Sequence, residues 1–358
     1  MIINKKILSL ITALIFSFSV IGCTEKTDVE KPDIDSESKI PSEPIRNTTF
    51  VMGTVLNVSI YDSSDESLFT LITNKVNDLD NILSANKTET EIDNINSNAG
   101  IKPVKVSDDT YTIINEGLKY SKMTDGKFDI SIGPLVKLWS IGLPEAKVPT
   151  NDEIANVLPL IDYNSIALNE AKKTVFLPKK GMKLDLGGIA KGYTVDVISD
   201  LLTENGVNSA IIDLGGNIYT HGKKVTGEDW VVGIQNPDSS RGEIIGKLLL
   251  SNKSIVTSGI YERYIEKDGV KYHHILNPED GYPYKNNIAG VTIISNDSIV
   301  GDALSTSVFA MGIEEGIKFI ESLDNVDAIF IDINNTVHLT SRLIDKFELT
   351  DPNFTLAQ

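Results

Sequence analysis

One short phrase occurs twice in this chain and constrains its fold more than any other feature. It reads Leu-Asp-Leu-Gly-Gly at residues 184–188 and Ile-Asp-Leu-Gly-Gly at residues 212–216. In each copy an aspartate lies in an apolar run that predicts the end of a strand. Two glycines follow, which adopt backbone angles that are closed to other residues. The pattern therefore predicts two tight turns, each with a carboxylate beside it.

The first copy is followed by Ile-Ala-Lys-Gly-Tyr at residues 189–193, which predicts the first turn of a helix. A strand end, a glycine turn, a helix start and Lys191 together suit a phosphate group. Backbone N–H groups of the turn would face the anion, and the helix dipole would add to the attraction. The alternative is a tight turn whose glycines only relieve a packing constraint. One copy alone does not decide between the two.

The N-terminus has the pattern of an export signal. Lys5 and Lys6 precede an apolar run from residue 7 to about residue 21, which is followed by Gly22 and Cys23. The run is short for a membrane-spanning helix, which needs ~20 apolar residues. Cys23 is the only cysteine of the chain, so an internal disulfide is impossible. Its position resembles the lipobox of bacterial lipoproteins. That resemblance implies cleavage of residues 1–22 as a lipoprotein signal peptide and lipid attachment at Cys23, with an ordinary secretion signal or an uncleaved anchor as alternatives.

The composition then divides the rest of the chain in two. Residues 23–45 are rich in Glu, Asp, Lys, Ser and Pro, which predicts a disordered tether. Residues 46–358 suffice for one large domain or two joined subdomains. We therefore expect a domain that is lipid-anchored at the extracytoplasmic face of the bacterial cell membrane. The net charge of −17 argues against nucleic acid as a partner, and an anionic ligand would need a metal or a few lysines.

Apolar spacing predicts a mixture of helices and strands. Helices are expected over residues 64–83, 107–123, 150–158, 190–204 and 301–323. Strands are expected over residues 50–60, 209–213, 230–235, 247–251, 254–257, 261–265 and 290–295, with a hairpin over residues 328–333 and 336–340. The pattern predicts an α+β fold with a long antiparallel run from residue 209 to residue 295.

Asp302 and Thr306 are four residues apart at the start of the last predicted helix, so they share one face. A carboxylate and a hydroxyl at this spacing suit a hard cation such as Mg²⁺, which prefers oxygen ligands. The alternative is an aspartate that is favoured by the helix dipole and a threonine on the buried face. On these two residues alone, the alternative is favoured.

Two further segments carry chemically informative side chains. His273 and His274 are adjacent, so on a strand only one of them faces a given site, where it would act as a general base or acid. The alternative is a structural histidine, and no further histidines or cysteines stand at zinc-binding spacing. Residues 127–142 combine Lys127, Phe128 and Asp129 with Gly, Pro and aromatic residues. They suit either a pocket for a planar ring or an ordinary strand and turn.

Taken together, these phrases resemble the ApbE family of FAD:protein FMN transferases. Each phrase is weak, but the set occurs in the family's order from about residue 50 to about residue 310. Members of the family are often exported lipoproteins, which agrees with Cys23. The matching phrases are Met-Gly-Thr at 52–54, Phe-Asp at 128–129, Gly-Pro-Leu at 133–135, Asp-Leu-Gly-Gly at 185–188, Ala-Lys-Gly-Tyr at 190–193, Asp-Leu-Gly-Gly-Asn at 213–217, Ser-Gly at 258–259, Tyr-Glu-Arg at 261–263, His-Ile at 274–275 with Pro278, and Asp-Ala-Leu-Ser-Thr at 302–306.

The resemblance implies an ApbE-like (T-fold-like) α+β architecture of two subdomains, with mostly antiparallel sheets flanked by helices. It implies Mg²⁺-dependent cleavage of the FAD pyrophosphate, with Mn²⁺ as an alternative metal. FMN would be transferred to a Thr or Ser hydroxyl of an acceptor flavoprotein, and AMP would be released. The acceptors of the family carry a motif of the type Asp-x-x-Ser/Thr-Gly-Ala-Thr, which this chain lacks.

The resemblance also assigns roles to residues. It implies that the metal is held by Asp302, Thr306 and a backbone carbonyl of the glycine turn, which we place at Gly188. His274 is expected to activate the acceptor hydroxyl, ahead of His273, because the family's histidine immediately precedes the isoleucine. FAD is expected to contact Met52, Asn86, Lys127, Phe128, Asp129, Asp185, Lys191 and Ile275.

The chain departs from the family's pattern at three places. Asn86 stands where the family often has an aromatic residue, so a ring-stacking contact is missing and water would compete with the protein hydroxyl. Ile260 replaces an acidic or amide residue, and Glu279-Asp280 replaces a basic residue followed by threonine. These departures keep two alternatives open, namely a Mg²⁺-dependent FAD pyrophosphatase that yields FMN and AMP, and a lipid-anchored FAD-binding protein without turnover.

Overall fold

The computed structural model describes residues 41–237, 239, 242–261 and 263–357. The predicted signal peptide, the lipidation residue Cys23 and most of the predicted tether lie outside the described residues. The described residues belong to one compact unit. Within them, no helix combines the length and the apolar character that a membrane crossing requires.

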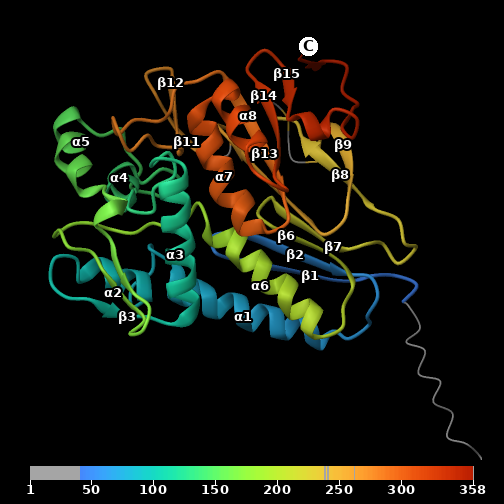
Figure 1. The fold of residues 1–358 in the computed structure, drawn as a ribbon, viewed down its shortest axis with the longest axis horizontal. Coiled ribbons are helices and arrows are strands. Elements are labelled where there is room, and N and C mark those ends of the chain that lie inside the picture. Colours follow the sequence, from blue (N-terminus) through green and yellow to red (C-terminus); the bar gives the residue numbers. More distant parts are fainter. Residues whose placement is uncertain (1–40, 238, 240–241, 262, 358) are drawn as a thin grey trace, which may run out of the picture. The chain divides into compact units, whose positions relative to one another are not determined.

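A nine-stranded sheet forms the centre of the fold (Figure 1). Neighbouring strands are antiparallel except for the last pair, which is parallel. In order across the sheet the strands are β1 (Ile45–Val51), β2 (Thr54–Ile60), β6 (Ser209–Leu214), β7 (Asn217–Gly222), β10 (Lys253–Gly259), β13 (Ile288–Ser295), β14 (Asp327–Asp332), β15 (Thr336–Leu339) and β17 (Thr355–Leu356).

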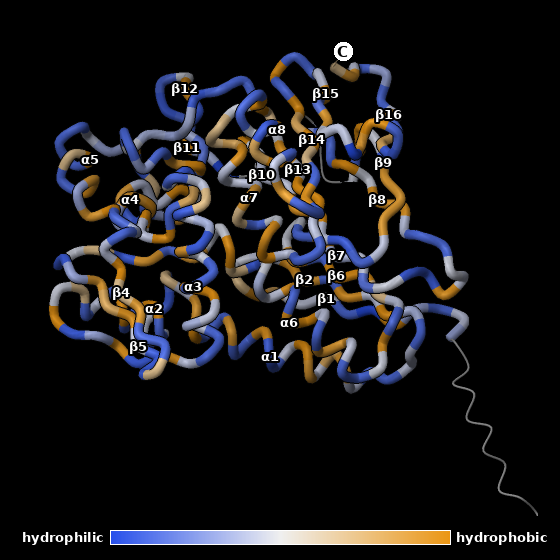
Figure 2. The backbone as a smooth tube through the Cα atoms, in the orientation of Figure 1, coloured by the Kyte–Doolittle hydropathy of each residue, from blue (hydrophilic) through white to orange (hydrophobic). Residues whose placement is uncertain are grey.

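Other elements of the fold cover both faces of this sheet. Alternate side chains of a strand point to opposite faces, so one strand packs against both layers. On β14, Phe330 packs with apolar residues of α7, whereas Ile329 packs with residues of a small second sheet. The first face carries α1 (Ser67–Leu83), α6 (Ala190–Glu204), α7 (Ser298–Met311) and α8 (Ile313–Glu321). The second face carries β8 (Trp230–Gln235), β9 (Ile244–Leu250) and β16 (Glu348–Leu349). In Figure 2 apolar stretches follow the strands of these layers, and hydrophilic segments lie at many of the connections.

A second, mainly helical region lies beside the sheet, on the left of Figure 1. Together the two regions match the predicted α+β fold with mostly antiparallel sheets. The region holds α2 (Glu91–Ser97), α3 (Asp108–Met123), α4 (Gly133–Trp139), α5 (Asn151–Val157), a small sheet of β3 (Val104–Lys105), β5 (Thr174–Phe176) and β4 (Ala167–Asn169), and the hairpin of β11 (Tyr264–Lys267) and β12 (Val270–His273). Short 3₁₀ turns lie at Leu158–Leu160, Tyr163–Ser165 and Ser341–Leu343.

Side-chain caps begin two of the predicted helices, α3 and α5. The side chain of Ser107 accepts a hydrogen bond from the Thr110 N–H at the start of α3. Thr150 and Glu153 form a capping box at the start of α5. Such caps are local, so the sequence alone indicates them.

Two predicted elements are interrupted by residues with positive φ. The predicted strand 50–60 is a hairpin of β1 and β2, because Met52 (φ 51°) and Gly53 (φ 71°) reverse the chain between them. The predicted helix 301–323 begins earlier, at Ser298, and Gly312 (φ 82°) divides it into α7 and α8. Apolar spacing continues across both breaks, which is why the pattern missed them.

The two Asp-Leu-Gly-Gly copies fold differently. The second is the turn of the β6–β7 hairpin, where Gly215 (φ 62°) and Gly216 (φ 98°) adopt the left-handed conformation. The first does not end a strand, because residues 184–188 are irregular. The Leu184 N–H donates to the side chain of Asn96 on α2, and the Asp185 N–H donates to the Ile130 carbonyl. Contacts with residues that are distant in the sequence, rather than strand pairing, therefore fix the position of this copy.

Candidate functional site

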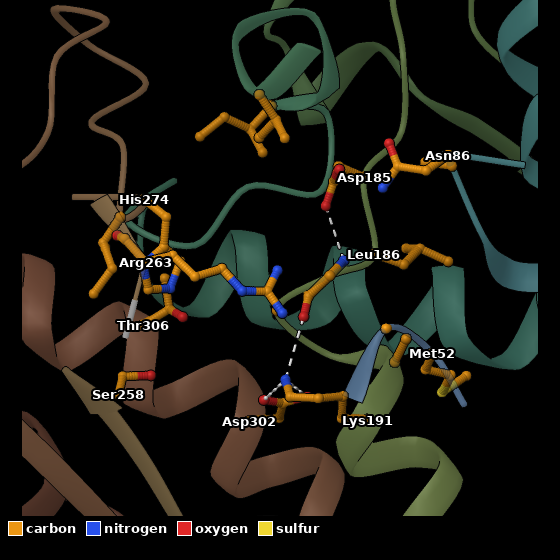
Figure 3. A pocket seen from close by; sticks show the side chains of 18 of the residues that line it. Met52, Asn86, Asp185, Leu186, Lys191, Ser258, Arg263, His274, Asp302 and Thr306 are labelled. Carbon is orange, nitrogen blue, oxygen red and sulfur yellow. Dashed lines mark hydrogen bonds and ion pairs between the residues drawn. The ribbon is translucent and has the colours of Figure 1, made fainter. Parts of the chain in front are cut away.

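A cavity of about 500 Å³ collects the chemically informative side chains of the chain (Figure 3). Its walls come from the end of α1, the segments before and after α4, the first Asp-Leu-Gly-Gly copy, β10 and the start of α7. Every residue that the sequence predicted to contact a substrate or a metal lines it: Met52, Asn86, Lys127, Phe128, Asp129, Asp185, Gly188, Lys191, His274, Ile275, Asp302 and Thr306. Their individual roles stay predictions.

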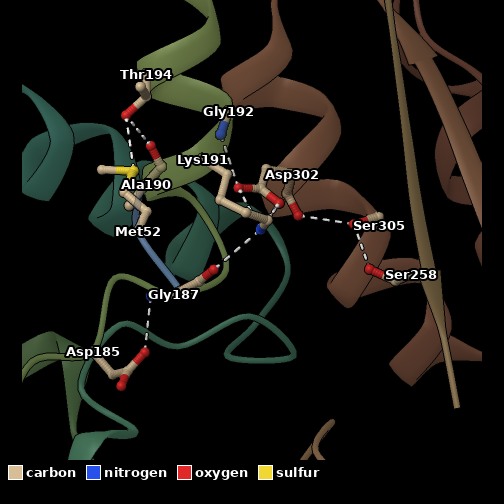
Figure 4. Close-up of polar contacts among 10 residues, drawn as sticks. All are labelled: Met52, Asp185, Gly187, Ala190, Lys191, Gly192, Thr194, Ser258, Asp302 and Ser305. Atoms are coloured by element: carbon tan, nitrogen blue, oxygen red, sulfur yellow. Dashed lines mark hydrogen bonds and ion pairs between the residues drawn. The ribbon is translucent and has the colours of Figure 1, made fainter. Parts of the chain in front are cut away.

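Asp302 is held where the first turns of α6 and α7 meet. The two helices approach closely at Gly192, where a Cβ atom would lie 2.4 Å from the Ser298 carbonyl oxygen. Asp302 Oδ2 accepts a hydrogen bond from the Gly192 N–H at 3.0 Å, and Asp302 Oδ1 lies 3.1 Å from Lys191 Nζ (Figure 4). The side chain is 4% exposed. A buried carboxylate thus lies at the positive end of α6 beside a lysine.

Thr306 and Gly188 lie close to each other in the same cavity. Thr306 is one turn beyond Asp302 on α7, and a Cβ atom at Gly188 would lie 3.7 Å from the Thr306 hydroxyl oxygen. The available donors are therefore a carboxylate, a hydroxyl and backbone carbonyls of the glycine turn. This all-oxygen set fits a hard cation that keeps positions for phosphate or water oxygens. No group of three or more His, Cys, Asp or Glu side chains with metal-binding geometry occurs among the described residues, so the fit rests on this smaller set.

Two further carboxylates in the cavity wall stabilise the local backbone. Asp185 Oδ1 accepts a hydrogen bond from the Gly187 N–H at 2.8 Å, and Asp129 Oδ1 accepts from the Ser131 N–H at 2.7 Å. Burial raises the pKa of both carboxyl groups, although hydrogen bonds partly oppose this. Phe128 lies under the glycine turn, since a Cβ atom at Gly188 would be 3.1 Å from its ring.

The structure distinguishes the two adjacent histidines. Both ring nitrogens of His273 are engaged, with Nε2 2.9 Å from the Tyr284 carbonyl oxygen and Nδ1 accepting from the Ile275 N–H. His274 instead lines the cavity, and its Nδ1 lies 3.3 Å from the Arg263 carbonyl oxygen. When Nδ1 donates to that oxygen, Nε2 is left to accept a proton.

Burial, with a smaller contribution from the positive charge of Arg263, lowers the pKa of His274 to about 4. The imidazole is therefore neutral at physiological pH, which is the form that a general base requires. His273 also has a lowered pKa because it is buried, but its nitrogens are occupied. The geometry thus favours His274, as the sequence predicted.

The residues that depart from the family's pattern lie in different parts of the fold. Asn86 lines the cavity in the loop after α1. Ile260 packs against the hydrophobic core. Glu279 forms an ion pair with Lys127 at 2.9 Å, so the missing basic residue is replaced by an acid that engages a lysine of the cavity wall.

Arg263 and Ser258 are polar residues of the cavity to which the sequence pattern assigns no role. The side chain of Arg263 extends across the cavity from the side of His274 toward Lys191 and Asp302 (Figure 3). Ser258 lies 2.8 Å from the Ser305 hydroxyl, which donates to the Asp302 carbonyl (Figure 4). Both residues belong to phrases that match the family's pattern. The direction in which their side chains point, however, depends on the geometry of β10 and β11.

Asp196 on α6 fastens the start of α7, and this contact leads to a pH prediction. Its carboxylate accepts hydrogen bonds from the Ser298 and Ile299 N–H groups at 2.6 and 2.8 Å. Burial, with smaller contributions from the carboxylates of Asp297 and Asp200, raises its pKa to about 7, although the two backbone hydrogen bonds oppose the rise. Because the folded state keeps this proton after the unfolded state has lost it, the group's contribution to stability is complete below about pH 4. It is lost as the pH rises toward 7.

Titration of Asp196 should make the free energy of unfolding fall as the pH rises from 4 to 7. We therefore expect Asp196→Asn to make this fall less steep, by the slope that corresponds to about one bound proton. Urea unfolding at half-unit pH steps measures that slope. The control is Glu204→Gln, which changes an exposed carboxylate at the end of α6 that is not among the charges that shift the pKa of Asp196. An unchanged slope in Asp196→Asn would contradict the assignment.

The sequence and the fold of this chain are similar to those of known proteins. A model of the ApbE family matches residues 52–330. A FAD:protein FMN transferase of Klebsiella pneumoniae is 38% identical, with 85% of this chain and 94% of that protein covered. One of Treponema pallidum is 34% identical, with 86% and 89% covered. Among solved structures, the ApbE protein of Thermotoga maritima superposes with a TM-score of 0.77 at 29% identity, over 84% of this chain and 98% of the other. The flavin transferase ApbE of Vibrio cholerae gives 0.76 at 26% identity, over 86% and 100%.

Proposed function

The chain belongs to the ApbE family, and we propose that it transfers FMN from FAD to a Thr or Ser hydroxyl of an acceptor flavoprotein, with release of AMP. One observation carries this proposal. A single cavity unites an oxygen donor set at Asp302, Thr306 and Gly188 with Lys191 and with a neutral histidine, His274. A cavity of about 500 Å³ is also of the size that holds small-molecule ligands.

The residues of the cavity suit the pyrophosphate and the ring systems of FAD. Lys191 and Arg263 supply positive charge for the pyrophosphate, in a chain whose net charge is −17. Phe128, Ile275 and Met52 supply apolar surface. Because few cations lie in the cavity, the placement of these two is expected to orient the phosphates.

The oxygen donors at Asp302, Thr306 and the glycine turn would hold Mg²⁺, or Mn²⁺ in its place. When bound, such an ion neutralises charge on the pyrophosphate. Lys191 is paired with Asp302 in the structure, and its ammonium group is expected to turn toward the phosphates when that carboxylate engages the ion.

The chemistry requires one proton transfer by the protein. His274 Nε2 accepts the proton of the acceptor hydroxyl as the hydroxyl oxygen bonds to the FMN phosphorus. The bond from that phosphorus to the bridging oxygen breaks, and AMP leaves with the electron pair. Arg263 and Lys191 stabilise the charge on the phosphates, and the neutral state of His274 makes it ready to accept.

The direct test incubates the purified chain with FAD and Mg²⁺, with and without a protein that carries the Asp-x-x-Ser/Thr-Gly-Ala-Thr motif. AMP release and the mass of the acceptor are followed together. We expect an acceptor mass increased by FMN less water, with one AMP released for each acceptor modified. AMP and free FMN with an unmodified acceptor would replace the proposal by FAD hydrolysis. Bound FAD without AMP would leave a binding protein.

FAD pyrophosphatase activity is the second candidate, and Asn86 is the observation that favours it. Asn86 is exposed at the cavity wall, and an amide there leaves room for water beside the flavin. We expect Asn86→Tyr to retain FAD longer and to slow hydrolysis severalfold, because an aromatic side chain stacks on the ring system. The measurements are FAD dissociation and acceptor-free AMP release. The control is Thr88→Ala, which changes an exposed residue of the same loop that does not line the cavity. If both rates are unchanged, Asn86 does not contact the flavin.

The position of the protein in the cell is part of the proposal. The pattern of Lys5, Lys6, the apolar run and Cys23 supports an exported chain that carries lipid at Cys23. Residues 23–45 would then serve as a tether between the membrane and the domain. An acceptor at the same membrane face would be within reach of such a tether.

A further inference from the structure

Asn217 is a buried polar side chain for which the described residues provide no hydrogen-bond partner. It is 2% exposed, and its Nδ2 atom is enclosed without a hydrogen-bond partner. Among the described residues, no hydrogen bond reaches its carboxamide oxygen either. Asn217 also lines the cavity. Since buried polar groups are almost always paired, an unpaired amide at a cavity wall points to a ligand that completes it.

The fold places this amide on the sheet face that α7 covers. Asn217 is the first residue of β7 after the Gly215-Gly216 turn, and it pairs with Val256 on β10. Residues that pair across strands share a face of the sheet. Val256 faces α7, because a Cβ atom at Gly301 would lie 2.7 Å from the Val256 side chain. Gly301 immediately precedes Asp302, so Asn217 lies on the sheet face that α7 covers at this level.

We propose that the Asn217 carboxamide donates a hydrogen bond to a pyrophosphate oxygen of FAD. This inference rests on the proposed function, since it assumes that FAD occupies the cavity. Phosphate oxygens only accept hydrogen bonds, so the amide must present Nδ2 to them. A half-turn about the Cβ–Cγ bond exchanges Nδ2 and Oδ1 without changing the packing. Phosphate thus satisfies an amide that the protein leaves unpaired.

An unpaired amide has a consequence that separates this role from a structural one. Without ligand it costs stability, because it has lost water and gained no partner. Replacing it by an apolar side chain of similar size therefore raises or preserves the stability of the free protein. The same replacement weakens binding of FAD. A purely structural asparagine would change stability without this selective loss.

The test compares the wild-type chain with Asn217→Leu by calorimetric titration and thermal unfolding in Mg²⁺ buffer. FAD is one probe, and riboflavin, which has no phosphate, is the other. We expect FAD binding about tenfold weaker, riboflavin binding unchanged and the ligand-free unfolding temperature equal or higher. Ser254→Ala is the matched control, since Ser254 Oγ is also buried and unpaired but does not line the cavity. Its binding of both probes should be unchanged.

A second variant keeps the test decisive if leucine does not fit. Asn217→Asp has the same shape but places a negative charge toward the phosphates, so it should weaken FAD binding more than tenfold and leave riboflavin binding intact. FAD binding at the wild-type level in both variants would overturn the inference and leave the proposed function standing. Equal weakening of both probes would overturn the pyrophosphate contact. Failure of the wild-type chain to bind FAD would overturn the proposed function together with it.

Discussion

Asp302→Ala is expected to reduce AMP release and FMN transfer together, by roughly a thousandfold or more. Asp302 is the only carboxylate of the proposed donor set, and it is buried against Lys191 and the Gly192 N–H. Without it, the phosphates lose the site that would hold a divalent cation, and Lys191 loses its partner. Discontinuous assay of AMP over a range of Mg²⁺ concentrations measures the effect.

Asp302→Asn serves as the companion variant. It keeps the size of the side chain and an acceptor for the Gly192 N–H, so it preserves the α6–α7 contact better than alanine does. We expect nearly the same loss of activity with native-like thermal unfolding. Undiminished AMP release in either variant would remove Asp302 from the metal site.

His274→Ala is expected to lower transfer to the acceptor by about a hundredfold to ten-thousandfold, because it removes the general base. FAD affinity should change little. Since the pKa of His274 is lowered to about 4, the wild-type transfer rate should be flat from pH 5 to pH 8 and should fall only as the pH decreases through about 4. Single-turnover transfer to the acceptor at constant ionic strength gives this profile.

The adjacent histidine provides the control. His273 bonds the Tyr284 carbonyl and the Ile275 N–H, so His273→Gln should mainly lower stability and leave the pH profile of transfer unchanged. Equal losses of FAD binding and transfer in His274→Ala would mean that this histidine is structural. A rate that falls near pH 6.5 would contradict the lowered pKa.

Elements with local signals could be predicted from the sequence. The helix Ala190–Glu204 and the strand Trp230–Gln235 have the predicted bounds, and Ser107 and Thr150 cap their helices. Breaks that depend on one backbone angle were missed, as at Gly312, because the apolar spacing continues across them. The pattern of the first Asp-Leu-Gly-Gly copy predicts a strand end. The segment is irregular instead, because contacts with distant residues hold it.

The sequence by itself determined which chemical groups the protein has and the family to which it belongs, because residue types and their order along the chain are sufficient for both. Only the tertiary structure decided which of these groups meet. Packing of α6 against α7 brings Asp302 to Gly192. The pairing of β7 with β10 places the unpaired amide of Asn217 on the sheet face that α7 covers. Such contacts follow from how apolar faces pack across long sequence separations, which local periodicity does not encode.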